Sequence, residues 1–383
     1  MEFGFLTQGY VPEAMRRADP DAEHTVLMDD LEVCQAADAA GFKYIWISEH
    51  HFLDEYSHIS ANDVFLGALA STTKRAHLGS GIFNPLPKVN HPAKVAERVA
   101  MLDHLTEGRF EFGTGRGAGS HEVTGFHDEL LGTDVSETKA IWEEVIGEFP
   151  KMWMQETYEG FDGKYWSMPP RKVLPKPYMK PHPPMWYAAG NTPSFEMAAR
   201  KGLGILGFSL DHIDVTEHAV RTYKAAIADA EPVGAFVNDN ILVAGGVAFI
   251  DEDRDQARRD ALAGGINYHI SQVFRYHDTF PRPEGIPAWP EVLPPYTDEV
   301  LDAMLDAGAA IIGDPDDALG QYRRWEAAGA DQILLLRGTK TKEQTLEMIR
   351  LMGEHVIPKL DTDPVHRTDR MRASATSATS AAG

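Results

Sequence analysis

The 383-residue sequence has a single cysteine and far fewer basic than acidic side chains. Cys34 has no second cysteine with which to form a disulfide or a thiolate metal site, so we expect it to be buried and inert. With 36 Lys and Arg against 58 Asp and Glu, the formal net charge is −22. Such an acidic chain is a poor candidate for binding nucleic-acid phosphates or anionic membranes, because both need clustered positive charge.

Long hydrophobic runs are also missing. Residues 1–6 lack the basic start and long apolar stretch of a signal peptide, and nowhere do about 18 consecutive apolar residues occur. We therefore expect a cytoplasmic protein that does not cross a membrane. Hydrophobic residues still make up 43% of the chain, enough for a large core. The last residues, 361–383, are rich in Ser, Thr and Ala without apolar periodicity, which predicts a disordered tail.

One local pattern occurs three times: an alanine-rich helix ends at a glycine, and a short apolar strand follows at once. The glycines are Gly41, Gly202 and Gly329. Glycine just past a helix end takes the left-handed conformation that other residues resist, and the apolar run fits a strand buried on both faces. The repetition indicates alternating α and β units.

Across the chain this pattern predicts eight strands, near 2–6, 44–48, 77–83, 110–114, 185–189, 204–208, 241–250 and 332–336. Helices are expected near 24–40, 61–74, 92–106, 137–154, 194–202, 214–231, 255–263 or a later piece, 315–328 and 342–355. Such alternation is typical of the α/β class and fits a (β/α)8 TIM barrel over residues 1–360. The aromatic segment 264–295, inserted after the seventh strand, is expected to be a lid or substrate wall.

Histidines follow the second predicted strand, in Glu49-His50-His51. Metal binding, acid/base catalysis and a purely structural pair are all open from the residues alone. Adjacent side chains leave a strand on opposite faces, so the two histidines are poorly placed to share a metal, and no other convincing ligand set is visible. A histidine at a strand end in the barrel mouth suits proton transfer. Glu49 is expected either to orient it or to stabilise the strand end.

A glycine-rich segment, 113–119, follows the fourth predicted strand and contains Arg116, which can clamp a phosphate directly. Gly113, Gly115 and Ala118 also fit the spacing of a dinucleotide-binding turn, with Asp134 as its acidic residue. Against that alternative, no clean amphipathic helix begins at Gly119.

A second candidate anion site is the segment 188–194, between the fifth strand and a helix. Backbone amides at a helix N-terminus bind anions, and Asn191, Thr192 and Ser194 can add side-chain donors. The same residue types also form an ordinary helix cap. Only proximity to Arg116 would favour an anion site.

Taken together, these residues resemble the bacterial luciferase-like flavin-dependent monooxygenases. The similarity covers most of the barrel and consists of Glu49–Phe52, Leu78–Gly81, His91-Pro92 with Ala96-Glu97, Leu102–Leu105 ahead of Gly108-Arg109, and Phe112-Gly113 through Arg116-Gly117. The order of these segments is more specific than any one of them.

The resemblance implies non-covalently bound reduced FMN, which reacts with O2 through a C4a-(hydro)peroxyflavin and passes one oxygen atom to a small organic substrate. The family's catalytic histidine corresponds to His50, and its phosphate-binding arginine corresponds to Arg116. A non-prolyl cis peptide bond is expected near Gly81-Ile82. The resemblance places further cofactor contacts at Asn84, Ala189, Gly190, Asn191, Thr192 and Ser194.

The resemblance also implies a separate NAD(P)H:flavin reductase as partner, and a homodimer formed by the helices near 61–74 and 92–106. Two alternatives remain open. One is a deazaflavin-dependent oxidoreductase of the same fold, and the other is a non-catalytic flavin-binding protein.

Overall fold

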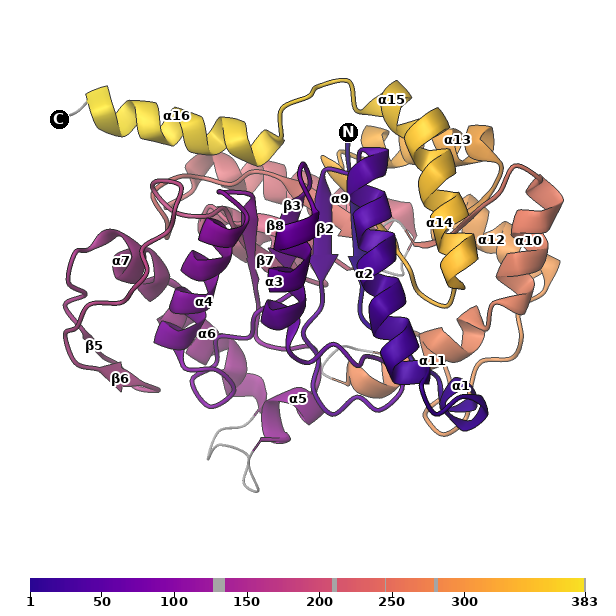
Figure 1. Cartoon of the computed structure of the whole chain (residues 1–383), viewed down its shortest axis with the longest axis horizontal. Helices are drawn as coiled ribbons and strands as arrows, with labels where there is room; N and C mark the ends of the chain where they lie inside the picture. The colour runs from indigo at the N-terminus through magenta and orange to yellow at the C-terminus, as the bar shows by residue number, and fades with distance from the viewer. Residues whose placement is uncertain (127–134, 209–211, 245, 279–281, 382–383) are drawn as a thin grey trace.

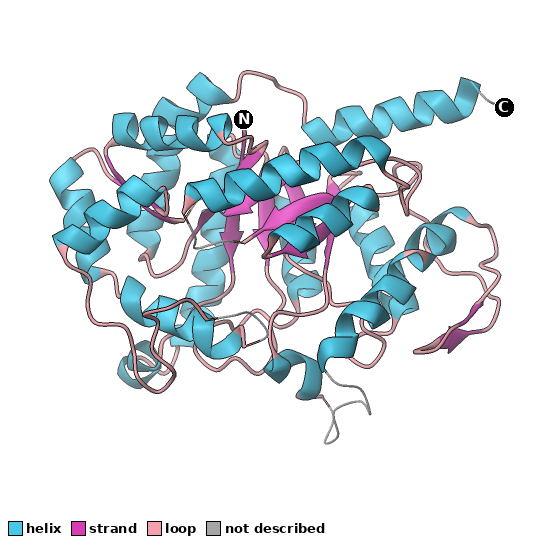
Figure 2. Cartoon of the chain, turned by 180° about the vertical axis from the view of Figure 1, so that it is seen from behind, coloured by secondary structure: helices cyan, strands magenta, loops and turns pink. Residues whose placement is uncertain are grey.

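Eight parallel strands close into a barrel, with helices packed around it (Figures 1 and 2). The computed structural model describes residues 1–126, 135–208, 212–244, 246–278 and 282–381. Around the barrel the order is β1-β12-β9-β8-β7-β4-β3-β2. The strands are β1 (Glu2–Thr7), β2 (Tyr44–Ile47), β3 (His77–Ser80), β4 (Phe110–Thr114), β7 (Met185–Ala189), β8 (Gly204–Gly207), β9 (Ile241–Ala244) and β12 (Gln332–Leu336). All eight overlap the predicted strands, which confirms the (β/α)8 barrel.

The surrounding helices are α1 (Glu13–Ala18), α2 (Ala22–Ala40), α3 (Asn62–Thr72), α4 (Pro92–Leu105), α5 (Ser120–Thr124), α6 (Thr138–Ile146), α7 (Glu148–Met154), α8 (Thr192–Arg200), α9 (Ile213–Ala226), α13 (Pro315–Ala327), α14 (Lys342–Leu351) and α15 (Ile357–Leu360). The predicted helices are present in order, except that the one predicted over 137–154 is two helices, α6 and α7, and that α1, α5 and α15 were not predicted. A short antiparallel pair, β5 (Phe161–Asp162) and β6 (Ser167–Met168), extends beside α7. None of the described helices is long and apolar enough to cross a membrane. Cys34 is buried and unbonded, as expected.

Side chains fill the inside of the barrel, so it is a packed core. The interior cluster contains Trp46 and Trp186, whose rings meet edge to face with 5.3 Å between centroids. Gly79 makes room for this packing, since a Cβ there would lie 2.2 Å from the Trp46 ring. Nε1 of Trp46 donates a hydrogen bond to Oε1 of Gln332 (3.2 Å).

The insertion after the seventh barrel strand forms a small unit of its own. It consists of β10 (Val247–Ile250), α10 (Arg254–Ala263), α11 (Ile266–Tyr276), α12 (Asp298–Ala307) and β11 (Ala310–Gly313). The single strand predicted over 241–250 is wrong: it is two strands, β9 and β10, interrupted near Gly246, which has φ +79°. The aromatic segment expected as a loop over 264–295 begins with the helix α11.

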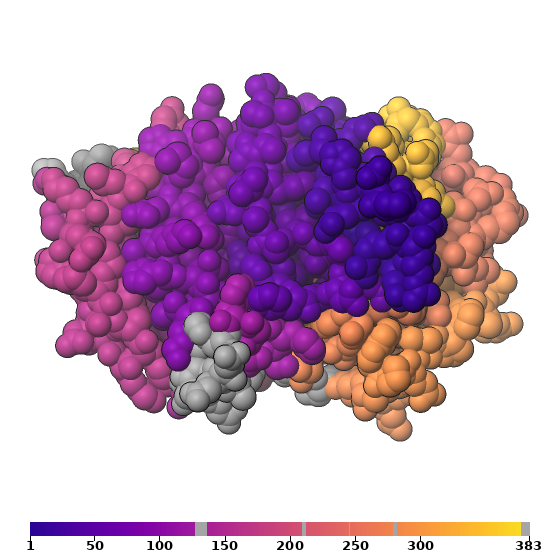
Figure 3. All heavy atoms as spheres, turned by 60° about the horizontal axis from the view of Figure 1, so that its bottom comes forward, coloured from indigo at the N-terminus to yellow at the C-terminus, as the bar shows by residue number. Residues whose placement is uncertain are grey.

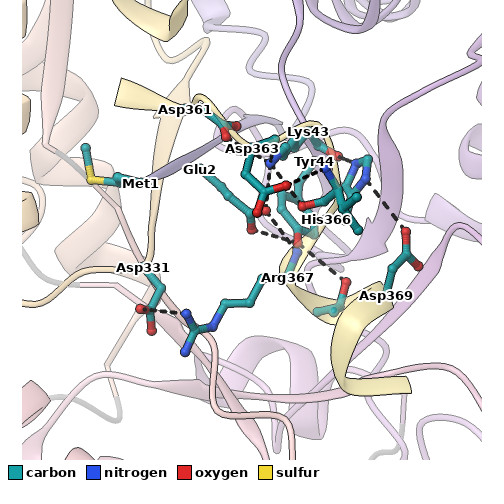
Figure 4. A network of polar contacts seen from close by, with 12 residues as sticks. Met1, Glu2, Lys43, Tyr44, Asp331, Asp361, Asp363, His366, Arg367 and Asp369 are labelled. Atoms are coloured by element: carbon teal, nitrogen blue, oxygen red, sulfur yellow. Dashed lines mark hydrogen bonds and ion pairs between the residues drawn. The ribbon is translucent and has the colours of Figure 1, made fainter. Parts of the chain in front are cut away.

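The C-terminal segment differs most from expectation. Residues 361–383 were predicted to be disordered, but α16 (Arg367–Ala381) lies across the end of the barrel opposite α5 and α11 (Figure 1). Lys43 at the start of β2 donates to Glu2 (3.0 Å) and Asp361 (2.9 Å), and the Arg367 amide also donates to Glu2 (2.9 Å) (Figure 4). Thr368 and Arg372 are buried. The prediction failed because polar groups, not an apolar stripe, attach this segment.

Candidate active site

The C-terminal ends of the barrel strands carry the predicted site residues. His50 follows β2, Gly81-Ile82 follows β3, Arg116 follows β4, and the segment 190–194 follows β7. The expected cis peptide bond between Gly81 and Ile82 is present. Figure 3 brings this end of the barrel forward, with the orange surface of the inserted unit beside the indigo N-terminal part of the chain.

His50 is hydrogen-bonded to a carboxylate that the sequence did not single out. Its ring Nδ1 lies 2.5 Å from Oε1 of Glu122, in the short helix α5. Glu122 is buried and also accepts hydrogen bonds from the backbone amides of His51 (3.3 Å) and Ala118 (3.1 Å). Three donors therefore fix the carboxylate, and the carboxylate in turn fixes the imidazole ring.

The charge of Glu122 determines which nitrogen of His50 exchanges a proton. Burial alone would raise the pKa of the Glu122 carboxyl, but the His50 ring and the Ala118 amide bring that pKa below its usual value. An ionised carboxylate only accepts hydrogen bonds, so Nδ1 of His50 carries the hydrogen and donates it. Nε2 is then the nitrogen that can take up or release a proton, as a general acid or base must.

Glu49 has partners other than His50. Its carboxylate accepts a hydrogen bond from Nδ2 of Asn90 (3.0 Å) and lies 3.1 Å from Nε2 of His51, and burial raises its pKa. Of the two roles expected for Glu49, the contacts fit stabilisation of the strand end, because the partner of the His50 ring is Glu122. Glu49 instead connects the loop after β2 to the loop after β3.

Aromatic rings surround His50. The Tyr56 ring lies 5.6 Å from the His50 ring, 5.4 Å from His269, 6.0 Å from Tyr276 and 5.6 Å from His277, measured between centroids. His269 and Tyr276 are on α11, and His277 follows it directly. The aromatic residues expected in a lid therefore do lie beside His50. Burial lowers the pKa of His277 to about 4, so its ring is neutral near pH 7.

Two contacts hold α11 over the site. The buried carboxylate of Glu55 accepts hydrogen bonds from the Tyr268 hydroxyl (2.8 Å) and from Nε2 of Gln272 (3.3 Å), both on α11. At the other end of the helix, the Ser120 amide donates to Oδ1 of Asp278 (2.8 Å). The element that carries Glu122 is thus joined directly to the lid.

Arg116 lies two strands away from His50 around the barrel. Its guanidinium donates to the Thr138 hydroxyl (3.2 Å), and no carboxylate in the described part of the chain forms an ion pair with it. Gly115, next to Arg116 in the chain, packs closely against the neighbouring loops: a Cβ on Gly115 would lie 3.3 Å from both Ile82 and Ala188. A partly exposed arginine next to a surface of small residues suits a flat cofactor with an anionic end.

The segment after β7 leaves the strand adjacent to that of Arg116, since Thr114 pairs with Tyr187. Asn191 caps α8 by accepting a hydrogen bond from the Ser194 amide (3.0 Å), which is the ordinary cap that the sequence also allowed. The start of α8 follows the strand next to the one that Arg116 follows, which is where an anion site shared with Arg116 would have to lie. Of the other predicted cofactor residues, Ala189 is buried and Gly190 is exposed.

Asn84 lies beside the Arg116 loop, because a Cβ on Gly117 would be 3.0 Å from its Nδ2. The alternative of a dinucleotide-binding turn is disfavoured. β4 belongs to a closed barrel, the helix that follows has only five residues, and Asp134 lies outside the described residues.

Atoms of His77, His366 and Asp369 at the opposite end of the barrel lie within 4.8 Å of one another. The two imidazole rings are stacked, 3.9 Å apart and inclined by 15°, so their lone pairs run nearly parallel and do not converge on one point. Nε2 of His366 also donates to the Lys43 carbonyl (3.0 Å). This geometry fits a hydrogen-bonded cluster that attaches α16 better than it fits a metal site.

Sequence reasoning missed Glu122 and Tyr56. Glu122 is 72 residues from His50 in the chain, and its helix is too short for a periodic pattern. Tyr56 lies in a loop where nothing distinguished it from other aromatics. The usable signal was an acidic residue directly after the glycine-rich segment, at the same barrel end as His50.

Comparisons with known proteins agree with this geometry. A family model described as luciferase-like monooxygenase matches residues 1–332. Limonene 1,2-monooxygenase of Rhodococcus erythropolis is 27% identical over 365 residues, which cover 94% of this chain and 88% of that protein. The oxygenase component of flavin-dependent trigonelline monooxygenase from Acinetobacter baylyi is 31% identical over 192 residues, which cover 50% of this chain and 51% of that protein.

Solved structures share the fold. The oxygenating constituent of 3,6-diketocamphane monooxygenase from Pseudomonas putida, in complex with FMN, has a TM-score of 0.73 at 20% identity, covering 94% of this chain and 98% of that one. The coenzyme F420-dependent tetrahydromethanopterin reductase of Methanopyrus kandleri has a TM-score of 0.62 at 19% identity, covering 94% and 99%. Since the family model spans most of the residues, from β1 to the start of β12, the chain belongs to the luciferase-like monooxygenase family.

Proposed function

We propose that this protein is the oxygenase of a two-component system, which uses reduced FMN and O2 to insert one oxygen atom into a small organic substrate. The observation that carries the proposal is the His50–Glu122 pair at the same barrel mouth as Arg116. A proton-transfer group beside a place for an anionic cofactor is what oxygen transfer by a flavin requires.

The residues present fit such a cofactor. Arg116 and the start of α8 would hold the phosphate, and Gly115, Ala188 and Ile82 would border the flat ring. When bound, reduced flavin supplies the activation of oxygen, and the protein supplies binding, orientation and protons.

His50 would manage the proton of the reaction. With Nδ1 held by Glu122, Nε2 can donate a proton to an oxygen atom in the mouth or remove one from the substrate. Tyr56 and the residues of α11 cover this point with aromatic surface, which excludes water from a reactive oxygen species.

A separate reductase would supply the reduced flavin. The related trigonelline enzyme is named as an oxygenase component, which implies a second component, and the described part of this chain is accounted for by one barrel and its insertion. A homodimer is also proposed: α2, α3 and α4 lie side by side (Figure 1) and expose Met28, Val64, Met101 and Leu105.

A deazaflavin-dependent hydride transfer is the second candidate, because proteins of this fold include one solved with FMN and one that depends on coenzyme F420. The two are separated by anaerobic equilibrium titrations of the protein with reduced FMN and with reduced F420. We expect reduced FMN to bind at least tenfold more tightly. Binding of F420 alone would replace the monooxygenase proposal. Binding of FMN without oxygen consumption or substrate turnover would indicate a non-catalytic flavin-binding protein.

A further inference from the structure

A hollow at the barrel mouth borders the aromatic rings that lie around His50. It lies at the C-terminal ends of β8, β9 and β12 and is covered by α11, so we call it the α11 pocket. Tyr56 and Phe208 belong to its wall. The ring of Tyr56 contacts His50, and that of Phe208 lies 5.9 Å from His277. The wall of the α11 pocket therefore shares the Tyr56 ring with the surroundings of His50.

The wall of the α11 pocket is mainly apolar, and it contains two buried polar side chains, Lys340 and His269. Lys340 lies in the loop after β12 and is only 6% exposed. Its ammonium donates to the Ala248 carbonyl (2.9 Å) and lies 4.7 Å from the centre of the Phe249 ring. Both of these groups belong to the wall of the α11 pocket, so the amine is on the pocket side of its loop.

Lys340 differs from the other buried lysine of the described chain. Lys43 is 7% exposed and makes ion pairs with Glu2 and Asp361, whereas no carboxylate in the described residues forms an ion pair with Lys340. Burial, together with the positive charge of Arg337 in the same loop, lowers the pKa of Lys340 to about 7. An anion beside a buried ammonium offsets the free-energy cost of burying its charge, and the described residues supply none to Lys340.

His269 faces the same space from α11. Its ring stacks on Tyr56, and its Nδ1 has no hydrogen-bond partner in the described residues, although the side chain is only 9% exposed. Burial and the nearby Lys340 lower the pKa of His269 to about 4, so the ring is neutral near pH 7. A neutral imidazole nitrogen and an ammonium thus border one apolar space, and both have unused hydrogen-bonding capacity.

We propose that the α11 pocket holds the substrate of the oxygenation by a carboxylate group, which pairs with the ammonium of Lys340 and accepts a hydrogen bond from His269. The apolar part of the substrate lies along Phe208, Ile270 and Val273 and points toward Tyr56, whose ring lies beside His50. Since the α11 pocket has a volume of only about 50 Å³, a short, mostly hydrocarbon monocarboxylic acid is the substrate class. This inference rests on the proposed function, because it takes His50 as the reacting end.

The carboxylate assignment is tested by binding alone. The FMN-loaded protein is titrated calorimetrically at pH 6.5 with propionate, butyrate and isobutyrate, each paired with the alcohol of the same skeleton. At least one acid is expected to bind more than tenfold more tightly than its alcohol. Lys340→Met should abolish that preference, Lys340→Arg should retain part of it, and the exposed control Lys94→Met should leave it unchanged. If no acid exceeds its alcohol, the inference is overturned.

The pH dependence of wild-type binding provides a second test that does not depend on a variant. Only the protonated amine pairs with a carboxylate, so affinity for the acid should fall by more than about tenfold between pH 6.5 and 8.5, while affinity for the alcohol stays constant. An acid affinity that does not change with pH would exclude Lys340 as the counter-ion. Repeating the titration without FMN separates the two claims, since a protein that prefers the acid but does not bind flavin would contradict only the proposed function.

Discussion

At the scale of single residues, Glu122 determines what His50 can do. An ionised Glu122 keeps the hydrogen on Nδ1 of His50 and leaves Nε2 for the reaction. Glu122→Gln removes the charge but little volume, and the side-chain amide can bind either tautomer of the ring. We expect product formation with an accepted substrate to fall by about 100- to 10,000-fold, the range for a lost acid or base, while FMN affinity changes little.

Glu49→Gln is the matched control for that variant, since Glu49 contacts His51 and Asn90. Glu49→Gln should lower the rate of product formation by less than about tenfold. Steady-state kinetics and flavin titration of the two proteins decide the point. A large loss in Glu49→Gln with normal activity in Glu122→Gln would reverse the two roles.

Arg116 is expected to contribute to the affinity for FMN and not to the rate of the reaction. Arg116→Ala removes a charge-assisted contact worth about 1.5–3 kcal/mol, so the dissociation constant for FMN should rise at least tenfold. Arg221→Ala, which breaks only an exposed pair with Glu217 on α9, is the control and should leave the constant unchanged. Fluorescence titration measures both. Equal FMN affinity in the two variants would place the phosphate elsewhere.

The strand-end rule of the barrel fold pointed to the histidines after β2 and to Arg116, because catalytic groups cluster at the C-terminal ends of the strands, and the family resemblance then favoured His50 over His51. Glu122, Tyr56 and Lys340 were not found in this way. Glu122 is distant in the chain from His50, Tyr56 also contacts α11, and Lys340 follows the last barrel strand. A single sequence does not show which loops meet above the barrel.

At the scale of elements, the contact between α5 and the end of α11 sets the position of the lid. A Cβ at Gly119 would lie 1.8 Å from the Tyr276 carbonyl oxygen, so Gly119→Ala must push the two helices apart. We expect a loss of about 1–3 kcal/mol in the free energy of unfolding and a larger loss of turnover.

Gly67→Ala is the control for that change, because Gly67 lies within α3 and a Cβ there meets nothing within 4 Å. It should stabilise the protein slightly, by about 0.5–1 kcal/mol. Chemical denaturation and activity assays of both variants are the measurements. Full activity in Gly119→Ala would show that turnover does not depend on the position of the lid.

The C-terminal segment is expected to contribute to stability. Truncation after Leu360 removes Asp361 from buried Lys43 and Thr368 from buried Glu111, and should lower the free energy of unfolding by at least about 3 kcal/mol. Truncation after Thr376, which keeps these contacts, is the control. Equal melting temperatures for the two truncated proteins and the full chain would mean that α16 does not stabilise the barrel.

These elements also show which parts of the fold sequence patterns can predict. The barrel strands were predictable because strands buried on both faces read as continuous apolar runs. α16 was not, since its buried side chains are Thr368 and Arg372, and their partners are polar groups at the start of β2 and β4 and at Gly108. The unit after β9 was only half predicted, because Gly246 divides one apolar run into strands of two different sheets.

At the scale of the whole molecule, buried histidines make stability depend on pH. Burial lowers the pKa of His182, His269 and His277 to about 4, and it also lowers that of His366. Between pH 6.5 and 4 the unfolded chain binds protons at these positions and the folded chain does not. The free energy of unfolding should therefore fall as the pH falls, by up to about 1.4 kcal/mol per histidine per pH unit.

His77 opposes this trend, since Asp369 and Glu111 raise its pKa against the effect of burial. The carboxyls of Asp30, Glu49, Asp103 and Asp361, whose pKa burial raises, oppose it at the acidic end of the range. Urea unfolding at pH 7, 6 and 5 measures the dependence. Stability that is constant or higher at pH 5 would contradict the neutral state assigned to these rings.

The central claim is that this barrel controls the reaction of reduced FMN with oxygen through His50 and Glu122. Its most direct test is rapid mixing of the anaerobic complex of protein and reduced FMN with oxygenated buffer, recorded by absorbance for the wild type and for Glu122→Gln. We predict a transient spectrum that outlives the reaction of free reduced FMN and that decays at a different rate in the variant. Direct return to oxidised FMN at the rate of free flavin, identical in both proteins, would contradict the claim.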